Sequence, residues 1–392
     1  MRRISAHYIF PIAQPPLRNA VVTLSDEGEI LDVSASRGNV QEEEGVEFYN
    51  GIIAPAFVNA HCHLELSYMR GKIACGTGLA EFVQQTGIQK RLTNTEQTQV
   101  AAQFADAHLY SSGVAAVGDI ANGSECFALK QNSRILYHTF VEKFGLLSSQ
   151  NQTIIQQAQQ LRQLAHGMGL SASVTPHAPY SVLPDLLQSL SILAQQQGIL
   201  SIHHQESKDE QQLFAHGSGA LASQFSAMGL TLPPANGQHS LQYLSQYVSR
   251  DLQMLLVHNL YTTCEHYDFT VRHWDKIFWI LCPLSNLYIE NTFPPVEMLR
   301  QKGAAIALGT DSFASHPSLL LIDDLIALHK HFPHIALHEL LTWATLNGAK
   351  ALRINKQFGS ISKGKRPGLV WIQGIDLQRL QLTEQTTARR II

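Results

Sequence analysis

The feature that constrains this chain most is the alternation of short apolar runs with longer helical stretches. Eight apolar runs predict buried strands. The predicted strands span residues 52–58, 114–120, 134–141, 170–175, 199–203, 254–257, 277–281 and 304–308. Strands separated by helices favour parallel βα units, and a (β/α)8 barrel of about 300 residues accommodates eight of them. An open doubly wound sheet is the alternative, because periodicity alone does not separate the two arrangements.

Both ends of the chain carry a different pattern, made of short strands. Two alternating runs, 19–25 and 30–33, flank a turn that contains glycine and predict a hairpin. Near the other end, residues 368–372 predict a further strand. The sequence therefore predicts β-rich ends around a central region of alternating strands and helices.

The composition narrows the class of protein. The 392 residues carry a formal net charge of −3, with 45% hydrophobic and 15% charged residues. This balance argues against a nucleic-acid binder and against a disordered chain. No run of 18 apolar residues occurs, and Gln14, Pro15 and Pro16 interrupt any signal-peptide core, so we expect no membrane partner. The five cysteines are scattered and form no C-x-x-C pair, which fits a cytoplasmic location.

His61 and His63 form the first motif with chemical content. Residues two apart on a strand point to the same face, so both imidazoles can reach one metal ion. In a chain with 19 histidines, chance predicts about one such pair, and His329-Lys-His331 is a second one. That second pair lies in a predicted helix end, where residues two apart diverge. We therefore expect a site only at the first pair, which follows a predicted strand.

Residues of metal-binding types also follow four other predicted strands. They are His177 after the fourth strand, His203, His204 and Glu206 at the fifth, His258 at the sixth and Asp311 after the eighth. In a (β/α)8 barrel the C-terminal strand ends share the face that carries catalytic residues. Histidine and aspartate ligands with an open position are typical of catalytic zinc or iron sites.

Several motifs together resemble those of the amidohydrolase superfamily, in its branch of metal-dependent aminohydrolases and chlorohydrolases. They are Ala54-Pro-Ala-Phe-Val-Asn-Ala-His61-Cys-His63-Leu-Glu65, Thr175-Pro-His177-Ala-Pro-Tyr180, His203-x-x-Glu206, His258, Ser285-Asn286, Gly309-Thr-Asp311-Ser and Gly359-Ser-Ile-x-x-Gly364-Lys-x-Pro-Gly368. The resemblance covers nearly the whole chain. It implies an α/β fold, with a distorted (β/α)8 TIM barrel over residues 51–355 and a small β-sandwich domain built from residues 1–50 and 356–392.

The same resemblance implies a metal site. One divalent ion, zinc or alternatively iron, would be bound by His61, His63, His203 and Asp311. His203 is preferred to His204 because the family's acid–base carboxylate follows the metal-binding histidine by three residues, and Glu206 has that spacing. No lysine ends the fourth strand to bridge two ions, so we expect a single ion. Lys143, beyond the third strand, keeps the two-ion alternative open.

The catalytic residues implied by the resemblance are Glu206, His258 and Asp311. Glu206 would take a proton from the metal-activated water and pass it to the leaving amine, while Asp311 would hydrogen-bond the hydroxide. His258 would orient the water or stabilise charge on the substrate, with a fifth metal ligand or a core histidine as alternatives. For substrate binding, His177 would contact a ring nitrogen, and Glu65 is either a second contact or a loop acid.

The chemistry implied is hydrolytic deamination of an amino-substituted aromatic ring on a small-molecule substrate. An adenine nucleoside derivative is expected, because the His-Leu-Glu continuation is similar to aminofutalosine deaminases and the histidine–proline segment to adenosylhomocysteine and methylthioadenosine deaminases. Guanine, cytosine or pterin substrates, hydrolysis of an amide, imine or halide, and an inactive scaffold are the alternatives. Segment 64–91, rich in glycine, is predicted to be a lid or an ordinary connection. A homodimer is the family expectation.

Overall fold

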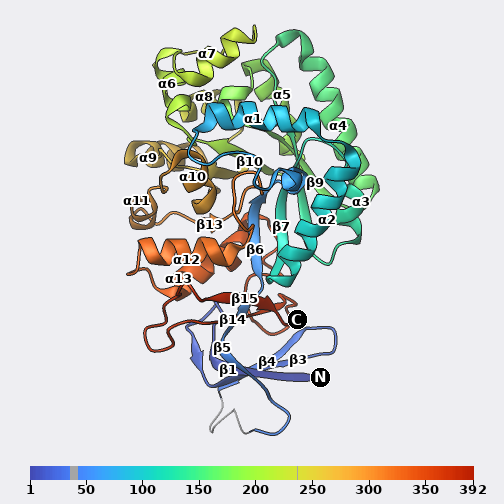
Figure 1. Cartoon of the computed structure of the whole chain (residues 1–392), viewed down its shortest axis with the longest axis vertical. Coiled ribbons are helices and arrows are strands. Elements are labelled where there is room, and N and C mark those ends of the chain that lie inside the picture. The colour runs from blue at the N-terminus through green and yellow to red at the C-terminus, as the bar shows by residue number, and fades with distance from the viewer. Residues whose placement is uncertain (36–42, 236) are drawn as a thin grey trace.

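A computed structural model describes residues 1–35, 43–235 and 237–392, so residues 36–42 of the predicted small domain lie outside the described residues. Within these ranges, two four-stranded parallel sheets are surrounded by helices, and a seven-stranded sheet is built from both ends of the chain. In Figure 1 the seven-stranded sheet lies below the parallel strands. The fold is therefore α/β, with parallel sheets, as the sequence predicts.

The two parallel sheets follow the order of the chain. The first is β6-β7-β8-β9 and the second is β10-β11-β12-β13. Their strands are β6 (Phe57–Cys62), β7 (Val114–Ala121), β8 (Leu136–Lys143), β9 (Ser171–Pro176), β10 (Ile199–His204), β11 (Gln253–His258), β12 (Ile277–Leu281) and β13 (Ile306–Leu308). All the predicted runs except the first agree with one of these strands to within two residues at either end.

The first predicted strand, 52–58, is divided between two sheets. Residues up to Pro55 belong to β5 (Glu47–Pro55), which pairs with strands of the seven-stranded sheet, and β6 begins at Phe57. Residues 51–62 are buried without interruption, so apolar periodicity could not mark the boundary. As a consequence, His61 lies within β6 and not after the strand.

Backbone hydrogen bonds join the two parallel sheets at the C-terminal ends of their strands. His203 N donates to His177 O at 2.9 Å, which links β10 to the end of β9. Thr310 N donates to His61 O at 3.0 Å, which links the segment after β13 to β6. The ends of both sheets are therefore held around one centre.

The parallel strands share a core, and the helices cover their outer faces. Core residues from both sheets include Val58, Ala116, Phe140, Leu255 and Ile280. The α-helices are α1 (Leu79–Leu92), α2 (Thr95–Ser111), α3 (Phe127–Asn132), α4 (Asn151–Gly167), α5 (Pro184–Gln195), α6 (Lys208–His216), α7 (Ala220–Ala227), α8 (Ser240–Tyr247), α9 (Cys264–His273), α10 (Pro283–Glu290), α11 (Val296–Gln301), α12 (Leu321–His331), α13 (Leu337–Thr342) and α14 (Gly348–Ala351). Short 3₁₀ turns η2 (Leu64–Met69), η3 (Ser148–Gln150) and η4 (Pro179–Ser181) and the π-turn η5 (Trp343–Asn347) complete the set. None of the helices in the described ranges combines the length and the apolar character that a membrane crossing requires.

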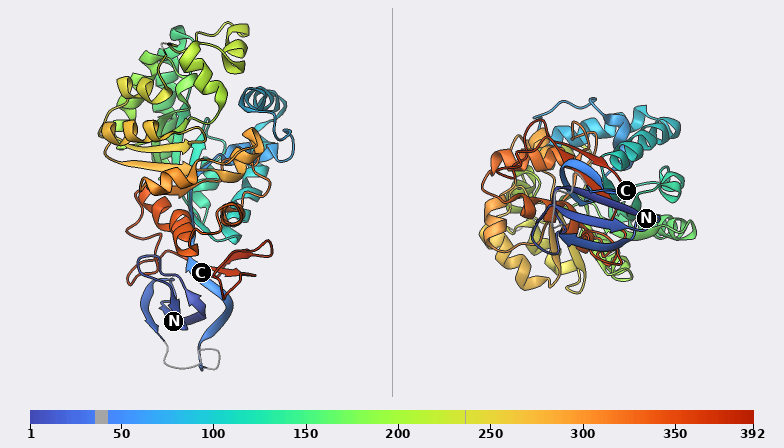
Figure 2. Two further views of the ribbon diagram at one scale, coloured as in Figure 1. Left: turned by 90° about the vertical axis from the view of Figure 1, so that its left-hand side faces the viewer. Right: turned by 90° about the horizontal axis from the view of Figure 1, so that it is seen from below.

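The seven-stranded sheet has the order β15-β14-β5-β1-β3-β4, with β2 paired to β1. Besides β5, its strands are β1 (Arg2–Ile9), β2 (Leu17–Arg18), β3 (Ala20–Leu24), β4 (Ile30–Ala35), β14 (Leu369–Gln373) and β15 (Thr387–Arg390). The predicted hairpin is confirmed as the antiparallel pair β3 and β4, and the predicted C-terminal strand is β14. Ile4, Val22, Ile53 and Leu369 form its own core, and Figure 2 shows both termini in this part of the molecule.

Candidate active site

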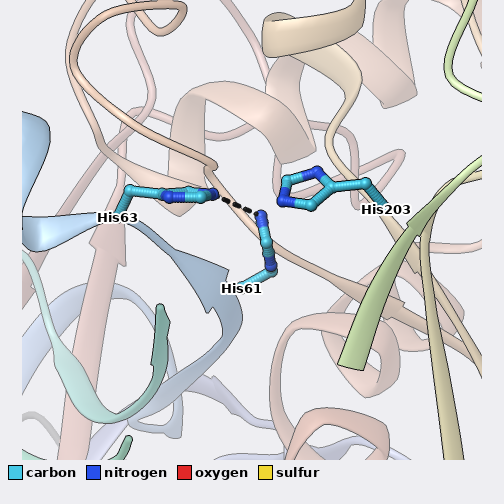
Figure 3. Close-up of side chains that lie close together, drawn as sticks. All are labelled: His61, His63 and His203. Atoms are coloured by element: carbon cyan, nitrogen blue, oxygen red, sulfur yellow. Dashed lines mark hydrogen bonds between the residues drawn. The ribbon is translucent and has the colours of Figure 1, made fainter. Parts of the chain in front are cut away.

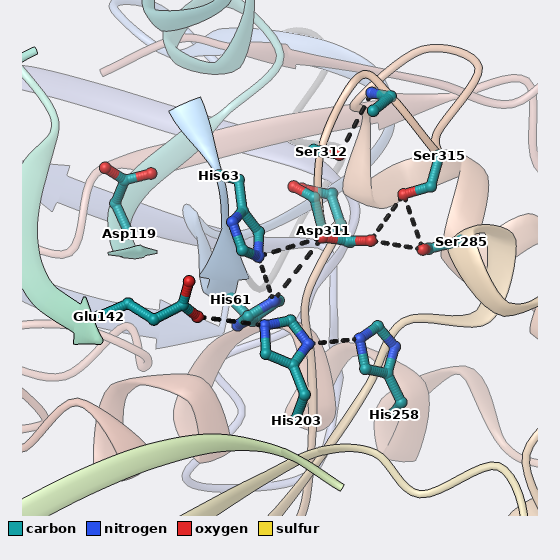
Figure 4. A network of polar contacts seen from close by, with 12 residues as sticks. His61, His63, Asp119, Glu142, His203, His258, Ser285, Asp311, Ser312 and Ser315 are labelled. Carbon is teal, nitrogen blue, oxygen red and sulfur yellow. Dashed lines mark hydrogen bonds and ion pairs between the residues drawn. The ribbon is translucent and has the colours of Figure 1, made fainter. Parts of the chain in front are cut away.

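The candidate site lies where strands of both parallel sheets end. His61 is on β6 and His63 directly follows it, His203 is on β10, and Asp311 follows β13. His258 is the last residue of β11. All five side chains are buried, and Figure 4 shows them turned toward a common centre. The structure therefore brings together residues that come from distant parts of the chain.

The backbone at three of these strand ends has a positive φ angle, which is uncommon for residues other than glycine. The φ angle is 46° at Gln205, 75° at His258 and 59° at Asp311. Backbone hydrogen bonds hold two of these turns, since Asp311 N donates to His61 O at 3.1 Å and Tyr261 N donates to Gln205 O at 3.0 Å. A positive φ angle costs energy for a residue other than glycine, so it persists only where the surrounding structure enforces it. Residues in such conformations are concentrated at functional sites.

His61, His63 and Asp311 place three donor atoms around one point. His63 Nε2 lies 3.2 Å from His61 Nε2, and Asp311 Oδ1 lies 3.4 Å from His63 Nε2 and 3.8 Å from His61 Nε2. Donors bound at about 2.0–2.1 Å to a tetrahedral zinc ion stand about 3.3 Å apart. The observed spacing therefore fits a shared divalent ion.

His203 completes this donor set. Figure 3 shows its ring beside His61 and His63, and donor atoms of the three histidines lie within 4.8 Å of one another. His203 Nε2 is buried and makes no hydrogen bond with the described residues, although Glu142 Oε1 lies 3.5 Å from it. An unpaired buried nitrogen is costly unless something binds it. Three imidazoles and one carboxylate form a donor set that suits zinc or iron.

The other nitrogen of His203 meets His258. His203 Nδ1 lies 2.9 Å from His258 Nε2. If Nε2 of His203 binds a metal, its Nδ1 carries the proton and donates it to His258. The Nδ1–H of His258 then needs an acceptor, and the side-chain amide of Asn286, 3.3 Å away, supplies one when its oxygen and nitrogen are exchanged. Asn286 Oδ1 otherwise lacks a partner among the described residues, which agrees with that exchange.

Two serines fix the carboxylate of Asp311. Ser285 Oγ donates to Asp311 Oδ2 at 2.7 Å and Ser315 Oγ donates to the same oxygen at 2.6 Å. Oδ1 is thereby left for the histidines. Burial opposes the charge of Asp311, but the contacts with His61 and His63 hold its pKa well below the ordinary value. Asp311 is therefore an oriented anion.

Glu206 lies two residues beyond the end of β10. Its Oε2 lies 3.4 Å from His258 Nε2 and 3.9 Å from His203 Nδ1, and the Tyr180 hydroxyl donates to its Oε1. Burial raises the pKa of the Glu206 carboxyl, against the lowering effect of His203 and of the Tyr180 hydroxyl. A buried carboxyl in this position can take up a proton and release it again.

His177 follows β9 and faces the same space. Its Nδ1 lies 2.8 Å from Ser181 Oγ, and burial lowers its pKa to about 4, so the ring is neutral near pH 7. The Ser181 hydroxyl also lies 3.1 Å from Ala178 O, so it donates to Nδ1 only in the tautomer of His177 that carries its proton on Nε2. In that tautomer His177 can donate a hydrogen bond to a ring nitrogen, which is the substrate contact that the sequence predicts.

A cavity of about 940 Å³ opens onto these residues. Its inner wall includes His63, His177, His203, Glu206, His258 and Asp311. Three aromatic rings also line the cavity: Phe82 on α1, Phe144 after β8 and Phe225 on α7. The segment 64–91 contributes η2 and α1, and α1 covers one side of the cavity. A movement of this segment as a lid stays a prediction.

Glu142 was missed by the sequence reasoning, which ended the third strand one residue before it. It lies near the end of β8, is 3% exposed and lines the cavity. Asn122 Nδ2 donates to its Oε2 at 2.8 Å, and its Oε1 lies 3.5 Å from His203 Nε2. Burial opposes its charge, but the imidazoles of His177 and His203 hold its pKa well below the ordinary value. The same signal, a polar residue at a strand end, could have found it.

Glu65 contacts Asn122, the residue that hydrogen-bonds Glu142. Its Oε2 accepts a hydrogen bond from Asn122 N at 3.0 Å, and it is absent from the described residues that line the cavity. Lys143 Nζ donates to Asn122 O at 3.1 Å. Both side chains therefore hold the Asn122 backbone, and this geometry favours a loop acid over a substrate contact for Glu65.

The remaining histidines of the motifs lie elsewhere. His204 Nδ1 lies 3.0 Å from Asn259 Oδ1, because successive residues of a strand point to opposite faces. His329 and His331 lie at the end of α12, where His329 Nδ1 accepts from Leu382 N at 3.2 Å and His331 stacks on Phe293. The structure therefore separates these three histidines from the donor set.

Comparison with known proteins identifies the family. Residues 52–390, which include every residue of the site, match the family described as Amidohydrolase family. The chain belongs to the amidohydrolase family. In this amidohydrolase, the tertiary structure gathers His61, His63, His203, His258 and Asp311 at the strand ends.

Similar proteins cover most of the chain. An adenosine deaminase of Helicobacter pylori is 29% identical over 333 residues, which are 82% of this chain and 79% of that protein. A 5-methylthioadenosine/S-adenosylhomocysteine deaminase of Teredinibacter turnerae is 24% identical over 366 residues, 89% of this chain and 77% of that protein. The crystal structure of Helicobacter pylori aminofutalosine deaminase with methylthio-coformycin aligns with a TM-score of 0.83 and 25% identity, over 100% of both chains.

Proposed function

We propose that this amidohydrolase is a metal-dependent hydrolytic deaminase that releases ammonia from an adenine nucleoside derivative. The observation that carries the proposal is the convergence of His61, His63, His203 and Asp311 beside the buried carboxyl of Glu206. The similar proteins named adenosine, methylthioadenosine and aminofutalosine deaminases support the substrate class.

We further propose the architecture that the family resemblance implied. The eight parallel strands would form a closed, distorted (β/α)8 barrel, since hydrogen bonds join both pairs of neighbouring sheet edges. The strands from both chain ends would form the small β-sandwich domain, 1–50 and 356–392. In that arrangement the site lies on the C-terminal face of the barrel, where this fold places its catalytic residues.

The proposed metal ligands are the Nε2 atoms of His61, His63 and His203 and the Oδ1 atom of Asp311. Zinc fits the donors, and iron is the alternative. A divalent ion bound there would lower the pKa of a coordinated water to about 7 and so supply a hydroxide nucleophile at neutral pH. His258 holds the Nδ1–H of His203 and so keeps Nε2 free for the metal.

The protein's own groups then have distinct tasks. Glu206 accepts one proton of the attacking water at Oε2 and delivers it to the ring nitrogen; the second proton of that water then passes through the same carboxylate to the amine, which leaves as ammonia while the ring carbon keeps the oxygen. Asp311 accepts a hydrogen bond from the nucleophile while the serines keep its orientation. His177 donates to a nitrogen of the purine ring and fixes the substrate. The 940 Å³ cavity is wide enough for a nucleoside with a further substituent.

Ammonia release tests the proposal. Zinc-loaded protein would be given adenosine, 5′-methylthioadenosine, S-adenosylhomocysteine, 5′-deoxyadenosine and aminofutalosine, with guanine, cytosine and a pterin in parallel. We expect ammonia from at least one adenine nucleoside, together with the change in ultraviolet absorbance that accompanies conversion of adenine to hypoxanthine. Release from guanine, cytosine or the pterin alone would replace the substrate class.

The control is Glu206→Gln, which keeps the size of the side chain and removes its proton-carrying oxygen. We expect this variant to hold one zinc ion per chain and to lose turnover. A folded, zinc-containing wild-type protein that releases no ammonia from any of these compounds would contradict the proposal. Weight would then move to hydrolysis of another carbon–nitrogen or carbon–halogen bond, or to an inactive scaffold.

A further inference from the structure

Tyr180 is a buried residue of the cavity that has no part in the function proposed above. It is 1% exposed, belongs to η4, and donates its hydroxyl hydrogen to Oε1 of Glu206. The other carboxylate oxygen, Oε2, faces His258 Nε2 at 3.4 Å. One oxygen of Glu206 is therefore held by the tyrosine, and the other is presented to the donor set.

The ring of Tyr180 is itself held by aromatic neighbours. It stacks on Phe225 of α7, with 6.5 Å between ring centroids and 26° between planes. It meets His177 edge to face at 5.7 Å and 87°. Aromatic pairs at these distances prefer such geometries. The hydroxyl oxygen therefore has little freedom to leave Glu206.

The turn that carries Tyr180 is anchored on both sides. Gly145 N donates to Ser181 O at 2.9 Å, and Leu183 N donates to Gly145 O at 3.1 Å. From α8, the Tyr243 hydroxyl donates to Val182 O at 2.7 Å. Pro179 begins the 3₁₀ turn, where its fixed φ angle is favourable. A rigid turn thus sets the position of Tyr180 before any substrate binds.

We infer that Tyr180 is a positioning residue, whose hydroxyl fixes the carboxylate of Glu206 so that Oε2 is aimed at the reacting atoms. A glutamate side chain has several rotatable bonds, and it turns between rotamers unless neighbours hold it. Proton transfer requires the carboxylate within hydrogen-bond reach of the proton it moves. The inference rests on the proposed function, because the contact can affect the reaction only if Glu206 is the acid–base residue.

The test removes one oxygen atom. Tyr180→Phe keeps the ring and its stacking but loses the hydroxyl. Loss of a hydrogen bond to a charged group changes an equilibrium constant about tenfold to hundredfold. We expect kcat to fall by about that factor, while KM stays within about twofold of the wild-type value. The matched control is Tyr137→Phe. It loses a buried tyrosine hydroxyl that also donates to a carboxylate, Asp106 Oδ1 at 2.7 Å, and that forms no hydrogen bond with Glu206 or with the turn of Tyr180. We expect the control to keep kcat within about twofold.

A double variant distinguishes positioning from general destabilisation. In the Glu206→Gln background, Tyr180→Phe should have no further effect on the residual rate, because the two residues act through one contact. If Tyr180→Phe lowered kcat equally in both backgrounds, or if Tyr137→Phe lowered kcat as much as Tyr180→Phe, the inference would be overturned. A near-normal rate for Glu206→Gln alone would instead overturn the acid–base role in the proposed function.

Measurements other than activity complete the test. Zinc content and the midpoint of thermal unfolding should be the same for Tyr180→Phe and Tyr137→Phe within error. In a crystal structure of Tyr180→Phe, we expect the Glu206 carboxylate to turn away from His258. A carboxylate that kept Oε2 about 3.4 Å from His258 Nε2 in the absence of the hydroxyl would show that Tyr180 does not position it.

Discussion

The hydroxyls of Ser285 and Ser315 should control the affinity of this protein for its metal ion. Both donate to Oδ2 of Asp311, at 2.7 and 2.6 Å, and Oδ1 is the oxygen that faces His61 and His63. Figure 4 shows the two serines on the side of the carboxylate away from the histidines. Replacing them with alanine removes the groups that orient the proposed ligand but leaves the ligand itself in place.

The expected size of the effect follows from the number of bonds lost. A hydrogen bond to a carboxylate contributes about 1.5–3 kcal/mol, and about 1.4 kcal/mol corresponds to tenfold in affinity. Each single variant leaves Oδ2 with one donor, so we expect zinc affinity to weaken about tenfold. The double variant leaves a buried oxygen without a donor, and we expect a loss of about hundredfold or more.

Competition with a chromophoric chelator would measure the zinc dissociation constant of each variant. Ser312→Ala is the matched control, because Ser312 adjoins Asp311 in the chain but its hydroxyl accepts from Ala314 N and does not contact the carboxylate. We expect the control to bind zinc as the wild type does. Unchanged affinity in the Ser285→Ala and Ser315→Ala double variant would refute the assignment of Asp311 as an oriented metal ligand.

Four further outcomes are expected. Glu206→Gln should lower kcat by about 10²–10⁴-fold, measured as ammonia release, since general acid–base groups contribute that much; a fall of less than tenfold would contradict its role. Burial raises the pKa of Glu65 to about 7 from 4.5. The charged form of Glu65 is therefore disfavoured in the folded protein, and the wild type loses stability as the pH rises from about 4.5 to 7. The Glu65→Gln variant does not have this loss. Measured by urea unfolding, its free energy of unfolding should exceed that of the wild type by up to about 3 kcal/mol more at pH 8 than at pH 4.5. A gain that did not depend on pH would argue against this. Lys130→Met should lose about 3–5 kcal/mol of unfolding free energy, because it leaves the buried carboxylate of Asp119 unpaired; replacing Asp119 as well should recover part of the loss. Chelation of the metal should lower the midpoint of thermal unfolding, and added zinc should restore it; an unchanged midpoint would mean that the folded protein holds no ion.

Much of the fold follows from local pattern. A strand that is buried on both faces is a short apolar run in the sequence, and seven of the predicted runs match observed strands to within two residues. The exception shows the limit of this signal, since β5 and β6 belong to different sheets but are joined by one buried segment. Only the hydrogen-bond partners of each residue separate them.

Some residues of the site could be selected from the sequence and others could not. His61, His63, His203, His258 and Asp311 could be selected because metal-binding residue types recurred at predicted strand ends. Glu142 carried the same signal and was missed, because the predicted strand ended one residue too early. Tyr180 carried no such signal, because a tyrosine near a strand end is more often part of a core.

The sequence by itself determined the alternation of strands and helices and the residue types at the strand ends. Together with the family resemblance, it also favoured His203 over His204, because Glu206 follows His203 by three residues. Only the tertiary structure decided which groups meet: the serines on Asp311, Tyr180 on Glu206, and the left-handed backbone of His258. The physical reason is that side-chain direction along a strand depends on local geometry, whereas a contact between strand ends depends on the order and register of strands that are far apart in the chain.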